Sequence, residues 1–456
     1  MKRYRSGIQR LWVVLSSLGS LLVSCERKEV TFSKDVQPVI IKNCAPCHRP
    51  GGGAPFSLIT YEDVSKRARM VAHVTSSGYM PPWPADRNYS KFLHERGLAK
   101  EEIEMIKAWY EQGAKPGDKL SASISIPEIN DMGRPDMVLD IQPIHIQGDN
   151  RDRFYVIKIP YEMPRSRYVR AVQFVTTQPA YAHHMNGHYL RFSDDTDPFK
   201  GERVIDIESD AYEQQFLKLE LLNRDGSVPE RVHSAVNYLP GAAGIKYPAG
   251  IGGFIMTPKG AFVANDIHYG PSRKNLVDSP KLYIYFSDQP PQRPTYELML
   301  GTNGVSPIEP PLQVPAGRIT SHTTRVKIHN DISVLTVNPH MHMIGKTFRA
   351  YALKPNGDTV NLVHIPQWRF RWQYFYTFPN PVRVPKGSTI VVDATFDNTA
   401  ENPDNPFDPP RPIGERLDRG GASMRATDEM LQFIITYMPY EKDDERIDLS
   451  KPVYSK

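Results

Sequence analysis

The clearest chemical signal in the chain is a pair of histidines, His340 and His342, separated by a single residue. Successive side chains on an extended strand alternate between its two faces, so these imidazoles are expected to point the same way. Neutral imidazole is the commonest metal ligand in proteins, and both copper and zinc accept it. The pair therefore predicts a metal site, although two solvated histidines at a strand end would show the same spacing.

The composition is that of a globular protein rich in turns. The chain has 456 residues, of which 40% are hydrophobic and 23% charged, in the ordinary range for folded domains. Its 41 prolines favour loops and turns over long helices. The net charge of +5 arises partly at the N-terminus, so it gives no reason to predict nucleic-acid binding.

Residues 1–25 have the layout of a bacterial export signal. Basic residues precede a mostly apolar run over residues 11–23, which is too short for a comfortable membrane span. The four residues that end in Cys25 resemble a lipobox, in which the cysteine is lipidated and becomes the mature N-terminus. We therefore expect an exported lipoprotein, periplasmic or at the cell surface, held to a membrane by acyl chains on Cys25. An ordinary signal peptide or an uncleaved anchor is the alternative.

A Cys-x-x-Cys-His motif at Cys44, Cys47 and His48 predicts covalent attachment of a c-type haem. Two thioethers would hold the porphyrin, and His48 would be the proximal iron ligand. A zinc ribbon would need a second cysteine pair, and Cys25 is the only other cysteine in the chain. A thioredoxin motif would need a βαβ context, whereas the surrounding pattern predicts helices at residues 35–43, 61–74 and 100–112, the last closed by Gly113.

The sixth iron ligand is predicted to be Met80, because a thioether raises the haem potential and suits electron transfer. A core methionine beside a proline turn is the alternative for Met80, and His73 and His94 are weaker candidates for the ligand. Residues 30–117 as a unit resemble a class I cytochrome c domain. That resemblance implies a small all-α domain with one haem c.

From Met137 onward the sequence pattern changes. Short runs of β-branched and aromatic residues alternate with turns that contain Pro, Gly and Asn. This pattern predicts an all-β sandwich or barrel in more than one copy, after a linker at residues 118–135. A Pro-rich stretch over residues 289–317 suggests a boundary, which gives β domains at 136–290 and 311–445. The strongest strand predictions are residues 154–159, 168–176, 282–286, 334–337, 347–353, 389–395 and 431–437.

Four fragments of the β region, in order, resemble the copper type II, ascorbate-dependent monooxygenases, which include the peptidylglycine α-hydroxylating and dopamine β-monooxygenases. They are His183-His184-Met185, His268-Tyr269-Gly270, His340-Met341-His342 with Gly345-Lys346 after it, and Thr427-Asp428-Glu429-Met430.

The resemblance implies two jelly-roll-like antiparallel sandwiches, each with one copper, facing each other across a solvent-filled cleft. The first copper would be held by His183, His184 and His268. The second would be held by His340, His342 and Met430, with a position open for O2. Three imidazoles suit a copper that transfers electrons, while a soft thioether favours Cu(I).

Several ligand assignments have alternatives. His183 and His184 would point to opposite faces of a regular strand, so sharing one metal requires a bulge or turn. His188 and His233 are alternative third ligands, and Met430 could be a core residue. Strand alternation argues otherwise for Met430, because Leu431, Phe433 and Ile435 form the more apolar face and leave Met430 on the other.

Two departures from the family pattern bear on the substrate. In the peptide-amidating branch an arginine two residues before the histidine pair grips the peptide carboxylate, and here that position is Asn338. A tyrosine four residues after the methionine is replaced by Ile434. Peptide amidation is therefore not expected. The family's disulfides are also absent.

A run of alternating aromatic residues predicts one further strand. Every second residue in it is aromatic: Trp368, Phe370, Trp372, Tyr374 and Tyr376. The aromatic face of this strand would pack in a core or line a substrate site.

Together these features predict an exported haem- and copper-containing monooxygenase that hydroxylates a C–H bond of a small substrate with O2. Electrons would reach the first copper through the fused haem from a respiratory cytochrome or quinol chain, or from an ascorbate-like reductant. A non-catalytic electron-transfer or copper-handling lipoprotein is the main alternative. A binding protein on a β-sandwich scaffold, without copper, is a third.

Overall fold

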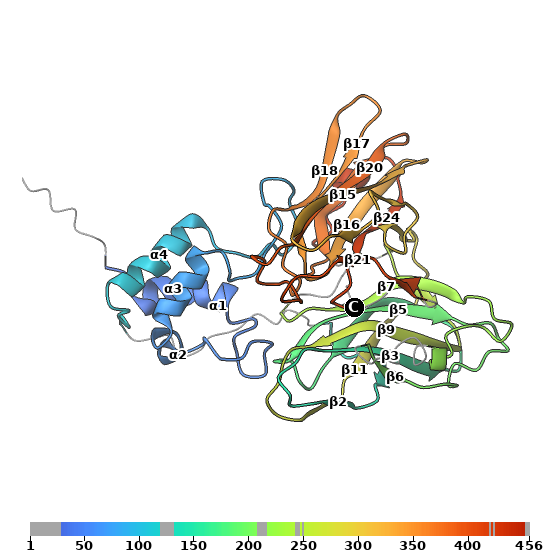
Figure 1. Cartoon of the computed structure of the whole chain (residues 1–456). Helices are drawn as coiled ribbons and strands as arrows, with labels where there is room; N and C mark the ends of the chain where they lie inside the picture. The colour runs from blue at the N-terminus through green and yellow to red at the C-terminus, as the bar shows by residue number, and fades with distance from the viewer. Residues whose placement is uncertain are drawn as a thin grey trace, which may run out of the picture.

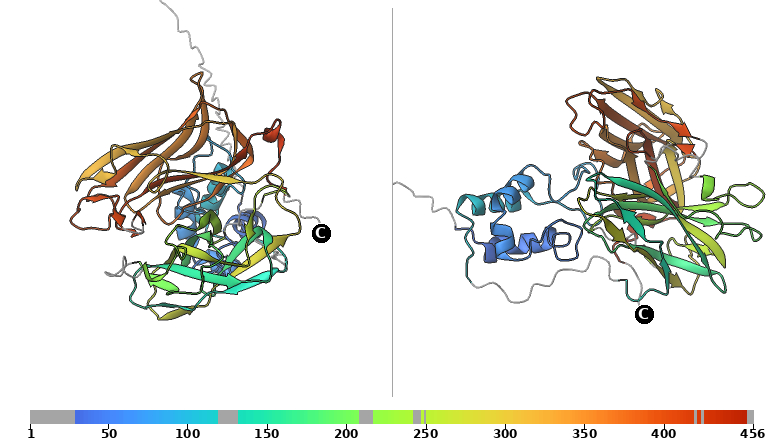
Figure 2. Two further views of the ribbon diagram at one scale, coloured as in Figure 1. Left: turned by 90° about the vertical axis from the view of Figure 1, so that its right-hand side faces the viewer. Right: turned by 60° about the horizontal axis from the view of Figure 1, so that its bottom comes forward.

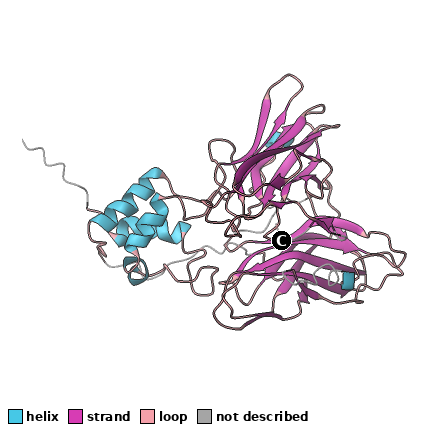
Figure 3. Cartoon of the chain, viewed as in Figure 1, coloured by secondary structure: helices cyan, strands magenta, loops and turns pink. Residues whose placement is uncertain are grey.

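The computed structural model describes residues 29–118, 132–207, 217–241, 247–248, 250–418, 421–422 and 425–451. Helices gather in the N-terminal part, and the rest of the described chain is mostly antiparallel sheet (Figure 3). The predicted signal sequence with Cys25, and the linker apart from its two ends, lie outside the described residues. Within them, no helix combines the length and apolar character that crossing a membrane requires.

Short helices build the N-terminal unit. The helix predicted at residues 61–74 is interrupted at Lys66 and Arg67, so that two shorter helices replace it. Gly113 follows the last helix with φ +87° and donates to the carbonyl of Tyr110 at 3.1 Å, which confirms the predicted cap. The elements are the π-helical turn η1 (Phe32–Val36) and the helices α1 (Gln37–Asn43), α2 (Tyr61–Ser65), α3 (Ala68–Ser76) and α4 (Lys100–Glu111).

The first β sandwich packs a five-stranded sheet of order β6-β3-β9-β5-β7 on a four-stranded sheet of order β1-β11-β4-β8. Its core lies between them, with Ile157 and Phe262 from one sheet and Leu282 and Ile284 from the other. Its strands are β1 (Met137–Asp140), β2 (Ile144–Ile146), β3 (Arg153–Glu162), β4 (Arg167–Val175), β5 (Ala182–Arg191), β6 (Val204–Asp206), β7 (Glu230–Tyr238), β8 (Phe254–Met256), β9 (Lys259–Tyr269), β10 (Leu276–Asp278) and β11 (Lys281–Ser287).

The second sandwich packs a four-stranded sheet of order β12-β24-β16-β19 on a five-stranded sheet of order β13-β15-β20-β17-β18. Val337 and Phe433 meet Phe348 and Val392 in its core. Its elements are β12 (Tyr296–Gly301), β13 (Ile308–Glu309), β14 (Gln313–Val314), β15 (Arg318–Lys327), β16 (Ile332–Met341), β17 (Gly345–Leu353), β18 (Thr359–Ile365), β19 (Tyr376–Val384), β20 (Thr389–Asn398), β21 (Ile413–Gly414), β22 (Leu417–Asp418), β23 (Gly421–Ala422), β24 (Leu431–Pro439) and the 3-10 turn η2 (Asp444–Arg446).

All seven strands that the sequence predicts most strongly are present as β3, β4, β11, β16, β17, β20 and β24. One strand prediction is wrong. Residues 366–375 form an irregular segment, and β19 starts only at Tyr376. The aromatic side chains of this segment diverge instead of sharing a face: Trp368 and Tyr374 enter the second core, while Phe370 packs against a cluster of the first sandwich.

The two sandwiches lie one above the other, and the helical unit lies beside their junction (Figures 1 and 2). The segment after α3 fixes the helical unit to the second sandwich. Leu93 N–H donates to the carbonyl of Thr377 at 2.7 Å, and the Tyr374 hydroxyl donates to the carbonyl of Pro82 at 3.0 Å. Phe92 is itself part of the second hydrophobic core.

Candidate metal centres

A bulge in β5 brings the histidines of the first sandwich together. Ala182 pairs with Tyr269 and His184 pairs with His268, so β5 has one extra residue, His183, between these pairs. A bulge re-aims side chains that a regular strand would send to opposite faces. The ring centroids of His183 and His184 lie 4.8 Å and 5.0 Å from that of His268. The irregularity that the sequence required for this histidine pair is therefore present.

Gly270 makes room for the ring of His183. A Cβ atom at Gly270 would lie 2.4 Å from Cε1 and 2.5 Å from Nε2 of that imidazole. No side chain of any size fits there without moving the ring. The glycine after His268 and Tyr269 thus belongs to the construction of the site.

Asp152 completes the first group, although no sequence pattern indicated this residue. Its Oδ1 lies 2.7 Å from Nε2 of His268. Ligand atoms of Asp152, His183 and His268 all lie within 4.8 Å of one another, and His184 stands beside His268. Because Nε2 of His268 faces the carboxylate, Nδ1 is the nitrogen through which His268 would bind a metal. Such a carboxylate orients the ligand and raises its basicity.

The electrostatics of the first group suit a cation. Burial lowers the pKa of His183 to about 3, helped by the neighbouring His268 and Arg371, so its imidazole is neutral at physiological pH. Burial by itself would raise the pKa of Asp152, but the hydrogen bond with His268 and the charge of Arg371 lower it overall. A neutral imidazole beside a carboxylate is the form of the site that a metal ion needs.

In the second sandwich, His340 and His342 lie on one side, as the strand alternation predicts. Their ring centroids are 5.1 Å apart. Nδ1 of His340 faces Oε1 of Gln373, and Nδ1 of His342 lies 3.0 Å from the carbonyl oxygen of Asp428. These contacts fix both rings and make Nε2 the nitrogen through which each histidine would bind a metal.

Met430 lies on the same face of the sheet as this pair. His340 pairs with Gln432 across β16 and β24, so continuing the register sets Met430 beside His342. Leu431, the neighbour of Met430 on the opposite face, enters the second core, as the alternation predicts. Met430 itself is only 1% exposed. A buried thioether next to two imidazoles is a donor set that fits Cu(I).

Glu429 connects the two backbone segments that carry the second group. Its carboxyl group accepts from the backbone N–H groups of His342, Ile344 and Met430 at 3.0, 2.9 and 3.1 Å. It therefore ties the histidine turn to the methionine, two segments more than 80 positions apart. Glu429 stands within a fragment that the sequence singles out, but nothing in that fragment revealed this role.

Phe370 contacts histidines of both groups. Its ring centroid lies 5.8 Å from that of His342, and 6.1 Å from those of His184 and His268. It also joins a hydrophobic cluster with Phe154 on the five-stranded sheet of the first sandwich. Where the family resemblance implies a solvent-filled cleft, this chain has an aromatic ring between the two groups.

The Cys-x-x-Cys-His motif follows α1 in the helical unit. Nδ1 of His48 lies 3.0 Å from the carbonyl oxygen of Phe56, which orients the ring and leaves Nε2 as the nitrogen for iron. Burial raises the pKa of Cys44 to about 12, so its thiol stays protonated at neutral pH. Met80 is half-buried and follows α3, where its N–H donates to the carbonyl of Val74. His48 is thus oriented as the haem motif predicted from the sequence requires.

The second cysteine of the motif faces the first sandwich. Cys47 Sγ lies 3.6 Å from the carbonyl oxygen of Pro240, just beyond β7, and 3.8 Å from Nη1 of Arg96. A Cβ atom at Gly241 would lie 2.2 Å from that sulfur. Nearby, a Cβ atom at Gly53 would approach Pro240 to 2.5 Å. The motif is therefore packed tightly against the sandwich that carries His183.

Comparison with known proteins supports part of this picture. Residues 295–405 match the family model for the copper type II ascorbate-dependent monooxygenase, C-terminal domain. The matched segment contains His340, His342 and Gln373, and ends before Met430. No curated protein matches the chain. The second sandwich is thus similar to a domain for which copper is expected, and a copper-dependent monooxygenase is supported at the level of that domain family.

Proposed function

We propose that the protein is a copper-dependent monooxygenase that hydroxylates a C–H bond of a small organic substrate. In the balanced reaction, R–H, O2, two electrons and two protons give R–OH and H2O. The proposal rests on one observation above all: histidines of both sandwiches contact the single ring of Phe370. One of these histidines, His342, falls in the segment that matches the monooxygenase domain.

Two copper ions would bind, one to each group. His183, His184 and His268 would hold the first, with Asp152 orienting His268. His340, His342 and Met430 would hold the second. Bound copper would supply one-electron storage at the first group and O2 binding at the second. The protein's own part is to fix the imidazoles through Gln373 and the carbonyl of Asp428, and to keep water out of the space that Phe370 occupies.

We further propose that a c-type haem on Cys44 and Cys47, with His48 and Met80 as iron ligands, delivers the electrons. Support comes from the contact of Cys47 with Pro240, because it sets the attachment site against the sandwich of the first group. The external donor would be a respiratory cytochrome or quinol chain, or an ascorbate-like reductant. Export and a lipid anchor on Cys25 complete the proposal and rest on the sequence alone.

The direct test is haem reoxidation. The full protein is reduced anaerobically, O2 is admitted, and the haem spectrum is followed with and without copper. The proposal predicts fast reoxidation that requires copper and accelerates when a hydroxylatable substrate is present. Reoxidation at the same rate in copper-free protein would overturn the electron route. Copper-dependent reoxidation without acceleration by any compound of a broad C–H substrate screen would favour the non-catalytic alternative.

A further inference from the structure

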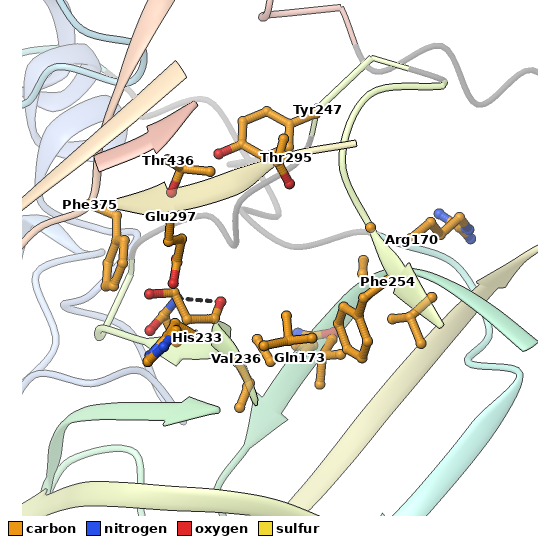
Figure 4. A pocket seen from close by; sticks show the side chains of 18 of the residues that line it. Arg170, Gln173, His233, Val236, Tyr247, Phe254, Thr295, Glu297, Phe375 and Thr436 are labelled. Atoms are coloured by element: carbon orange, nitrogen blue, oxygen red, sulfur yellow. Dashed lines mark hydrogen bonds between the residues drawn. The ribbon is translucent and has the colours of Figure 1, made fainter. Parts of the chain in front are cut away.

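A cavity of about 530 Å³ lies between the two sandwiches, apart from both histidine groups. Its walls come from β4 and β7 of the first sandwich and from β12 and β24 of the second (Figure 4). Aromatic rings line much of it, including Tyr238, Phe254 and Phe375. A cavity of this size and mixed character is of the kind that takes small organic ligands.

The cavity is lined in part by the same sheet face that carries the second histidine group. Glu297 pairs with Thr436 across β12 and β24, and both line the cavity. Farther along β24, Gln432 pairs with His340. Thr436 and Gln432 share a face because they are four positions apart, and that spacing is about 13 Å along a strand. Since Glu297 and His340 lie on the two strands that flank β24, a molecule on this face would have to span more than that spacing to extend from one to the other.

Two acceptor oxygens of the cavity-lining residues are left unsatisfied among the described residues, Oδ1 of Asn237 and Oε2 of Glu297, and only Glu297 can carry a charge. Its Oε2 is buried and has no hydrogen-bond partner among the described residues. Burial raises the pKa of Glu297 to about 7, against a smaller opposite effect of a hydrogen bond from Ser234. Burial and the Ser234 hydrogen bond account for this pKa, and no cation contributes to it among the described residues. A buried carboxyl oxygen without a partner is costly unless a ligand completes it.

The strand opposite Glu297 is distorted toward it. Between the pairs Gly187–Val236 and Tyr189–Val232, β7 has three residues where β5 has one. Ser234, in the middle of this bulge, has φ +43°, a left-handed conformation that costs a non-glycine residue free energy. The bulge aims Ser234 at the Glu297 carboxyl group. Bulges are over-represented both next to active sites and at sheet edges, and β7 is an edge strand.

The missing clamp of the peptide-amidating branch points the same way. Asn338 and Ile434, which replace the arginine and the tyrosine, face each other across β16 and β24. Asn338 donates instead to the carbonyl oxygen of Tyr374 at 3.1 Å. These two positions next to His340 thus carry uncharged side chains, whereas a carboxyl group stands farther along the same face.

We propose that this cavity binds the protonated amine end of an elongated organic substrate, with the carboxylate of Glu297 as its ionic partner. The rest of the substrate would run along the face of β24 toward His340, His342 and Met430. This inference rests on the proposed monooxygenase function for its biological meaning, but its binding step does not depend on copper.

The experiment is isothermal titration calorimetry of the full, copper-free protein with n-hexylammonium and with n-hexanoate. The proposal predicts that wild type binds n-hexylammonium and binds n-hexanoate at least tenfold more weakly. Glu297→Gln, which keeps the shape and removes the charge, should weaken n-hexylammonium binding at least tenfold. Glu401→Gln, at an exposed position, is the matched control and should bind like wild type.

Other outcomes overturn the inference. Equal binding of n-hexylammonium by wild type and Glu297→Gln, or no binding by wild type, would exclude Glu297 as the ionic partner. Preference for n-hexanoate would make Arg231, which also lines the cavity, the charged anchor instead. If binding depends on Glu297 but the protein takes up no copper, the amine-binding inference is supported and the monooxygenase proposal is wrong.

Discussion

The ring of Phe370, from the second sandwich, lies 6.1 Å from the ring of His268, in the first. The same ring lies 5.8 Å from His342 of its own sandwich. Next to it, Arg371 approaches Asp152, the carboxylate that orients His268, to 3.9 Å between Nη2 and Oδ2. Two consecutive residues of one loop thus connect the candidate metal groups of both sandwiches.

Replacing Phe370 by alanine should uncouple the two groups while leaving each intact. We expect unchanged copper content, a fall of at least tenfold in substrate-dependent O2 uptake, and a loss of about 1–3 kcal/mol in unfolding free energy from the lost apolar contacts. Phe370→Leu, which keeps most of the apolar volume, is the control for stability. Full O2 uptake in Phe370→Ala would show that the ring is only a packing element.

Asp152→Asn should weaken copper binding at the first group alone. The asparagine keeps the shape but loses the charge that raises the basicity of His268, so we expect copper affinity there to fall about 10- to 100-fold. Competition with a chelator of known affinity measures both sites. Asp288→Asn is the matched control, because Asp288 is 96% exposed. An equal loss at both sites would contradict this role for Asp152.

Glu297 should make stability fall as pH rises. Its pKa is about 7 in the folded protein and about 4.3 in an unfolded chain, so between these values the folded state holds the extra proton. The resulting stability is present below about pH 4 and is lost as pH rises through 7, by roughly 1–3 kcal/mol. The other charged groups that line the cavity are Arg170, Glu230 and Arg231, and the other titratable side chains there include His233 and Tyr247.

The measurement is urea unfolding of the copper-free protein at several pH values. In Glu297→Gln this contribution disappears, so the difference in unfolding free energy between wild type and variant should change with pH in that window. A difference that stays constant from pH 4 to pH 8 would mean that Glu297 titrates normally.

Gly241→Ala should loosen the packing of the Cys-x-x-Cys-His motif, the proposed haem attachment site, on the first sandwich. The new Cβ would meet Cys47 Sγ at 2.2 Å, so the motif must move away. We expect normal haem content but slower electron transfer from haem to copper, measured by pulse radiolysis. Gly226→Ala is the matched control: it also has a positive φ, but a Cβ there meets nothing within 4 Å. Equal transfer rates in both variants would exclude this contact as an electron route.

Local patterns in the sequence predicted much of this architecture. Alternation identified the core face of β24 through Leu431 and Phe433, because one face of a sandwich strand must be apolar. The same rule required the bulge at His183. Alternation failed over residues 366–375, where tertiary contacts pull Trp368 into one core and Phe370 toward the other sandwich.

Reasoning from local sequence patterns could not identify the residues that support the two histidine groups. Asp152 meets His268 across 116 positions, and Gln373 meets His340 across 33. Neither residue stands in a motif, because a contact between distant segments needs only one suitable side chain at one place. Only the fold brings such pairs together.

The most direct test of the account is the copper content of the purified full protein, for wild type, His268→Ala and Met430→Ala. The account predicts two coppers in wild type and the loss or weakening of one copper in each variant. His268→Ala should affect only the copper of the first group, and Met430→Ala only that of the second. Wild-type protein that takes up no copper, even under reducing conditions, would contradict it.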